Sequence, residues 1–96
     1  MLLGKVVGTV VATQKVDTLD GLKFLLVRAV GDDLSEGSAL VVCADSVGAG
    51  VGEIVLFCQG SAARQTPVTV NRPVDGVIMA IVDQLSVQGE VRYTKE

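Results

Sequence analysis

The chain has 96 residues, of which 49% are hydrophobic and only 3% aromatic, and its mean hydropathy of +0.52 is high for a small monomer. The net charge of −3 argues against a basic nucleic-acid-binding face, and the absence of histidine removes the commonest general base and transition-metal ligand. No apolar run approaches the roughly 20 residues of a membrane span, and Lys5 and Gly8 interrupt any resemblance to a signal peptide. We therefore expect one domain over 1–96 whose outer faces are buried against copies of itself.

The first part of the chain predicts two strands joined by a turn. Leu2–Gln14 carries adjacent valines, which point to opposite faces of a strand, so both of its faces are expected to be apolar. Gly4 and Gly8 indicate bends or bulges of the kind that a barrel corner needs. Asp17–Gly21 is a turn, and Leu22–Val30 returns as a second strand that is again apolar on both faces.

Two further strands flank a glycine-rich loop. Gly31–Gly37 is polar and acidic, which predicts a surface loop, and it is followed by strands over Ala39–Ala44 and Glu53–Cys58. The intervening segment Asp45–Gly52 resembles a dinucleotide-binding loop, but Glu53 stands where the third glycine of G-x-G-x-x-G belongs, and a strand-like run follows instead of a helix. The glycines are therefore expected to serve backbone geometry or the close approach of another chain.

The remainder predicts a helical turn, a last main strand and an exposed tail. Gly60–Gln65 breaks the strand pattern, and Ser61 is expected to cap a single helical turn. Arg64 would either hold an anion at the start of that turn or, as we favour, pair with a carboxylate across a subunit interface. Val77–Val87 is predicted as the last main strand, and Glu90–Glu96 is expected to add a short exposed one.

The two cysteines, Cys43 and Cys58, lie in apolar strand-like runs. Structural zinc takes four Cys or His ligands, so two thiols without histidine make a poor metal site. We favour buried, reduced thiols, while a disulfide between adjacent strands stays open.

Five strands with one short helical turn between the fourth and fifth predict an all-β fold, a small five-stranded OB-like barrel. An SH3-like barrel or an open sandwich is the structural alternative. Barrels of the OB type usually bind oligonucleotides or sugars through exposed aromatic and basic residues. Only three aromatic side chains are present, so this barrel lacks the residues that such binding requires.

Six blocks carry a resemblance to a known family, and they follow the family's order from one end of the chain to the other: Gly8–Lys15, Gly21–Leu26, Ala44–Gly50, Gly60–Arg64, Pro73–Asp75 and Ala80–Asp83. Together they resemble the pentameric vertex proteins of bacterial microcompartment shells. Gln65, Arg72–Asp75 and Tyr93–Lys95 are most similar to the cyanobacterial carboxysome branch. Ile54 stands where that branch often carries Trp, so a vertex protein of an ethanolamine, propanediol or glycyl-radical compartment is the alternative.

The resemblance implies a structural protein and not an enzyme. It implies a cytoplasmic homopentamer that closes the vertices of an icosahedral shell. In the carboxysome, this shell serves CO₂ fixation and photosynthesis. The implied partners are copies of itself and hexameric shell proteins, with no nucleic acid, membrane, metal or cofactor. The residues expected at the subunit interface or pore are Asp45, Gly48, Ala49, Gly50, Glu53, Ser61 and Arg64.

Each of these residues has an expected role. Gly48–Gly50 lacks bulk, which would let neighbouring backbones approach closely, while Glu53 and Arg64 are candidates for an interface ion pair or hydrogen bonds. Asp45 and Asp83 are expected to cap turns or to contact a neighbouring backbone. A small ligand-binding barrel that uses the loop from Gly48 to Gly52 is a much weaker alternative.

Overall fold

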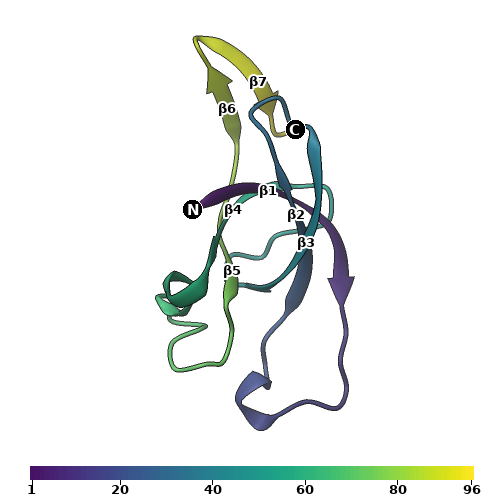
Figure 1. Ribbon diagram of the computed structural model, residues 1–96, viewed down its shortest axis with the longest axis vertical. Coiled ribbons are helices and arrows are strands. Elements are labelled where there is room, and N and C mark those ends of the chain that lie inside the picture. The colour runs from purple at the N-terminus through teal and green to yellow at the C-terminus, as the bar shows by residue number, and fades with distance from the viewer.

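A computed structural model describes residues 1–96 and contains seven strands and two 3-10 helices (Figure 1). In chain order these are β1 (Leu2–Val10), η1 (Asp17–Leu19), β2 (Phe24–Val30), β3 (Glu36–Asp45), β4 (Ile54–Gln59), η2 (Gly60–Arg64), β5 (Gly76–Ile81), β6 (Gln84–Val87) and β7 (Glu90–Thr94). No helix has the length and apolar character needed to cross a membrane.

Strands β1 to β5 close into a barrel with the order β1-β2-β3-β5-β4. Strand β1 pairs antiparallel with both β2 and β4, while β3 and β5 run parallel where Ala44 lies opposite Val77. This closure, with η2 between β4 and β5, confirms the predicted five-stranded OB-like barrel. The register of β1 shifts between Val6 and Gly8, at one of the two glycines where a bulge was expected.

The barrel interior is filled by one cluster of buried side chains. Its members come from all five barrel strands and the loop after β3, and they are Val6, Leu25, Val27, Cys43, Ala49, Val55, Phe57 and Ile78. Gly4 makes room for this packing, because a Cβ atom at that position would lie 2.5 Å from Val27 Cγ1 and 2.8 Å from Phe57 Cε1. The interior is therefore a packed core that leaves no space for a ligand.

A second, smaller cluster lies on the outside of the barrel, where η2 covers it. Ala44, Cys58 and Val77 point outward from three strands and pack against Ala63 of η2. Strands that are apolar on both faces therefore contribute side chains to the barrel interior from one face and to this second cluster from the other. Part of the outer apolar surface is thus buried within the subunit itself.

The two cysteines belong to different clusters, Cys43 to the interior and Cys58 to the outside, and both are free. The disulfide that the sequence left open is not formed. Burial raises the pKa of the Cys43 thiol to about 12, so this side chain is a neutral apolar packing group at ordinary pH.

Several predicted boundaries are wrong for reasons of pairing. The single strand predicted over Val77–Val87 is two strands. After Val82 donates its N–H to Ile54 O (2.8 Å), the chain has run past the first residue of β4 and leaves the barrel. Strand β3 begins at Glu36, inside the predicted surface loop, because Glu36 pairs with Val30. Strand β1 ends at Val10, short of the predicted Gln14.

Strands β6 and β7 form a hairpin that is separate from the barrel sheet. Figure 1 shows it extending beyond the barrel at the end opposite η1, which gives the molecule extents of 46 × 24 × 23 Å. Strand β7 confirms the short exposed strand expected in the tail.

Candidate subunit interface

The loop after β3 is organised around one carboxylate. Oδ1 of Asp45 accepts the backbone N–H groups of Val47, Gly48 and Ala49 at 3.1, 3.1 and 3.2 Å. The Asp45 side chain is only 3% exposed, and Lys23 Nζ lies 4.0 Å from its other oxygen. The amides with which such a loop would hold a phosphate are therefore already bound to the protein's own carboxylate, which argues against the ligand-binding alternative.

The small residues of this loop differ in what the subunit requires of them. Gly48 and Gly52 have φ of +78° and +94°, a conformation that glycine adopts without strain. Ala49 differs from the expectation of an interface residue, because it is 1% exposed and packs in the barrel interior. Gly50 has no positive φ, and an added Cβ would meet only Glu53 Oε1 at 3.4 Å. Of these four residues, Gly50 alone is required neither by a positive φ nor by the packing of the barrel core.

Glu53 joins this loop to the C-terminal strand. Its Oε1 accepts the Gly50 N–H at 2.5 Å, and its Oε2 lies 2.8 Å from Lys95 Nζ. The hydrogen bond from Lys95, followed by that from Gly50, lowers the pKa of Glu53, and the same contact raises the pKa of Lys95. Within the subunit Glu53 therefore pairs with Lys95, a contact that the sequence did not suggest, and the interface contacts expected of Glu53 and Arg64 stay a prediction.

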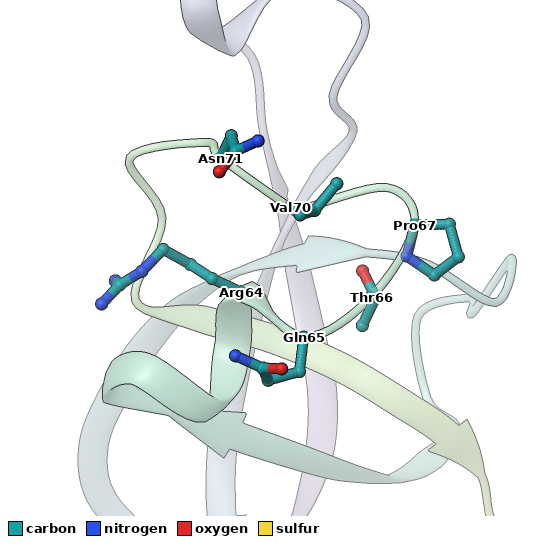
Figure 2. A pocket seen from close by; sticks show the side chains of 6 residues that line it. All are labelled: Arg64, Gln65, Thr66, Pro67, Val70 and Asn71. Carbon is teal, nitrogen blue, oxygen red and sulfur yellow. The ribbon is translucent and has the colours of Figure 1, made fainter.

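Arg64 lies at the end of η2, beside a shallow pocket that it lines with Gln65, Thr66, Pro67, Val70 and Asn71 (Figure 2). One of its guanidinium nitrogens, Nη1, donates to the Val74 carbonyl at 3.1 Å. The expected capping role of Ser61 is wrong. The turn already begins at Gly60, whose φ is +70°, and the preceding residue Gln59 makes no side-chain cap.

The loop that follows η2 is held by a pair of threonines that sequence reasoning missed. The buried Thr69 hydroxyl donates to Ala63 O at 2.6 Å and lies 2.7 Å from the Thr66 hydroxyl. Thr66 Oγ1 also accepts the Thr69 N–H at 3.0 Å. The signal was the Thr-x-x-Thr spacing, since a threonine oxygen binds the backbone a few residues away in such turns. This network fixes the loop that carries the exposed Val68 and Val70.

Two exposed apolar side chains mark the outer face of β3, which the sequence analysis did not single out. Leu40 and Val42 are 49% and 48% exposed and lie on the same side of the strand. Val42 is opposite Leu26 of β2, and Leu26 is opposite Gly8 of β1. These three residues form an apolar row across the three strands.

Comparisons with known proteins relate this geometry to a family. Residues 1–83 match the family described as ethanolamine utilisation protein EutN/carboxysome. The carboxysome shell vertex protein CcmL of Gloeobacter violaceus is 44% identical over 96 residues, which is 100% of this chain and 96% of the relative. The chain belongs to the EutN/CcmL family. The predicted family is thereby confirmed, together with the prediction of a structural shell vertex protein that is not an enzyme.

Other EutN/CcmL members are similar over most of their length. The microcompartment shell vertex protein PduN of Salmonella typhimurium is 48% identical over 90 residues, covering 90% of this chain and 99% of the relative. The solved structure of Gloeobacter violaceus CcmL superposes with a TM-score of 0.94, covering 99% of this chain and 98% of that one. The pentameric shell protein GrpN of Rhodospirillum rubrum is 40% identical with a TM-score of 0.80, covering 91% and 98%.

Proposed function

We propose that this protein forms a cyclic homopentamer that closes the vertices of a carboxysome shell in the cytoplasm, bordered by hexameric shell proteins. The observation that carries the proposal is the full-length likeness to a carboxysome vertex protein, with a TM-score of 0.94. That likeness extends beyond residue 83, where the family match ends, and so includes the β6–β7 hairpin.

The physical properties of the subunit support a ring. The closed barrel has no free sheet edges, so assembly can use its outer faces or the separate β6–β7 hairpin. Those faces carry the exposed Leu40 and Val42, and the separate hairpin adds half-buried apolar side chains. A contact between two different faces of one chain is heterologous, and it closes into a ring when the rotation between neighbours is right.

One observation favours a second compartment. The bacterial microcompartment shell vertex protein PduN is 48% identical over 90 residues, against 44% over 96 for the carboxysome relative. Sequence identity alone therefore does not separate the two compartments. A vertex protein of a propanediol, ethanolamine or glycyl-radical compartment is the second candidate function.

The ring is tested by native mass spectrometry across a dilution series. Five chains of 9.9 kDa give a mass of about 50 kDa, and we expect this species to persist at low micromolar protomer concentration. A monomer or dimer at all concentrations would contradict the proposal.

The compartment is tested by co-expression with hexameric shell proteins. We expect closed polyhedra in electron micrographs when the hexamers come from a carboxysome, and open sheets or tubes when they come from a propanediol compartment. The reverse result would favour the second candidate.

A further inference from the structure

We propose that the pocket at the end of η2 binds a small oxyanion, a carboxylate or phosphate group, through the guanidinium of Arg64. The pocket and all of its lining residues belong to one chain, so this inference goes beyond the proposed ring and does not depend on it. The pocket holds about 610 Å³, which lies within the roughly 300–1,000 Å³ of small-molecule sites. Its volume therefore suits a small metabolite that carries one anionic group.

Arg64 has more unused hydrogen-bonding capacity than the other cations of the subunit. Arg64 and Arg72 are the basic side chains that no carboxylate approaches within 4.0 Å. Arg72 is engaged within the subunit, where its Nη1 donates to Asp20 O at 2.6 Å and to Thr18 O at 3.3 Å. Arg64 makes a single hydrogen bond, from Nη1 to Val74 O. Its other N–H groups have no acceptor in the subunit, and an anion is the strongest partner for such a half-buried guanidinium.

The rest of the pocket is polar and carries no negative charge. Figure 2 shows Gln65 beside Arg64 and Asn71 on the loop across from them, and no lining residue is acidic. A carboxamide donates through its NH₂ group and accepts through its oxygen, and neither of these two side chains is hydrogen-bonded within the subunit. The guanidinium and the NH₂ groups would therefore bind the oxygens of an anion. The amide oxygens would accept hydroxyl groups from the body of the ligand, and Val70 would contact its carbon atoms.

The loop that forms the far wall of the pocket is already fixed. At its start, the Thr69 hydroxyl donates to Ala63 O at 2.6 Å and lies 2.7 Å from the Thr66 hydroxyl. At its end, Arg72 ties it to the connection between β1 and β2. Asn71 has a φ of +59°, a left-handed conformation that asparagine adopts more readily than most residues. A preorganised wall loses little conformational entropy on binding, so that more of the contact energy contributes to affinity.

Binding is tested by titrating the isotope-labelled protein with inorganic phosphate, acetate and glycerol phosphate in sodium chloride at constant ionic strength. We expect saturable shifts of the side-chain NH₂ signals of Gln65 and Asn71, with midpoints at about millimolar concentration or below. Glycerol has the hydroxylated body without the charge. It is the matched ligand control and should give no saturable shift.

The role of the guanidinium is tested by substitution. Arg64→Gln keeps a hydrogen-bonding side chain without the charge, and we expect the phosphate midpoint to rise by about tenfold or more. Asn71→Asp keeps Arg64 and places a carboxylate on the far wall, in a backbone conformation that aspartate also adopts, so it should weaken binding similarly. Lys15→Gln is the matched control, because it removes one charge outside the pocket, and it should keep the midpoint within about twofold. Circular dichroism checks that each variant is folded, and Asn71→Asp decides if Arg64→Gln is not.

The native mass of each sample separates this inference from the proposed function. A phosphate midpoint that depends on Arg64 supports the inference, and a monomeric wild type that still binds phosphate would support the pocket while contradicting the ring. Equal midpoints for wild type and Arg64→Gln, or a wild type without saturable shifts, overturn the inference. A wild-type ring that binds no anion but dissociates on Arg64→Gln also overturns it, since the guanidinium would then bind a carboxylate of a neighbouring subunit.

Discussion

Lys95 Nζ lies 2.8 Å from Glu53 Oε2, and this contact ties the end of the C-terminal hairpin to the glycine loop of the barrel. The other carboxylate oxygen of Glu53 accepts the Gly50 N–H, and the Lys95 N–H donates to Asp83 O at 2.8 Å. The base of the hairpin and the loop are therefore held as one unit, although they are distant in the sequence.

The Glu53 to Lys95 pair predicts a defined pH dependence. Because the pKa of Glu53 is lowered from its ordinary 4.5, the pair stabilises the fold above that pH and is lost as pH falls through the folded-state pKa. The pKa of Lys95 is raised from 10.5, so the contribution is complete below 10.5 and is lost as pH rises through the folded-state value. We expect Glu53→Gln to lower Tm slightly between roughly pH 5 and 10 and to match wild type at either extreme.

The control for this pH profile is Asp20→Asn, which removes an ion pair of 3.7 Å at a residue with a 66% exposed side chain. Its Tm should follow wild type at every pH. Equal profiles for the two variants would show that the Lys95 contact adds nothing to stability.

Removing the Asp45 carboxylate should destabilise the barrel. Asp45→Ala leaves the N–H groups of Val47, Gly48 and Ala49 without their acceptor, and the last of these residues is in the core. We expect a loss of about 2–3 kcal/mol in urea unfolding at fixed protomer concentration. The exposed Asp83→Ala should stay within about 0.5 kcal/mol of wild type. A similarly small effect at Asp45 would mean that the loop does not depend on its carboxylate.

Gly50 and Gly52 should respond differently to a valine. Gly50→Val is expected to fold normally but to raise the dilution midpoint of the ring by about tenfold, because the subunit itself leaves room for the side chain and a neighbouring backbone would not. Gly52→Val should lower the free energy of unfolding, since its φ of +94° is strained for any branched residue. Full-size rings of Gly50→Val at low concentration would count against a subunit contact at this residue.

Two glycines of β1 provide an internal comparison of packing. Gly4→Ala should destabilise the barrel by about 1–3 kcal/mol, because the new methyl would lie 2.5 Å from Val27 Cγ1 in a filled core. Gly8→Ala should be tolerated, since its nearest neighbour is Leu26 Cδ1 at 3.4 Å on the outer face. Equal unfolding midpoints for the two variants would show that the core side chains around Gly4 rearrange to accept the added methyl group.

The barrel was predictable because its signals are local. Adjacent valines such as Val6 and Val7 indicated strands with two apolar faces, and the helical turn predicted over Gly60–Gln65 appeared as η2. The division of Val77–Val87 into β5 and β6 was not predictable, because the interruption depends on where the partner strand β4 begins. When a partner strand elsewhere in the chain sets the end of a strand, the residues around that end do not indicate the boundary.

The candidate site was predicted only where a side chain acts on its own loop. Asp45 caps the turn as expected, since its partners are the residues that directly follow it. The ion pair of Glu53 with Lys95 joins residues from opposite ends of the chain, and no spacing rule connects them. Ala49 was grouped with the two glycines by size, whereas the direction of its side chain depends on the path of the loop.

The closure of the barrel has a kinetic consequence. Strand β1 must find β4, as in the pair of Leu2 with Phe57, and β3 must find β5, as in the pair of Ala44 with Val77. Proteins dominated by such non-local pairings fold in milliseconds to seconds, because a long loop is ordered before the contacts that stabilise it form. Once released from denaturant, the subunits should therefore show a concentration-independent lag, set by barrel closure, before any larger species accumulates.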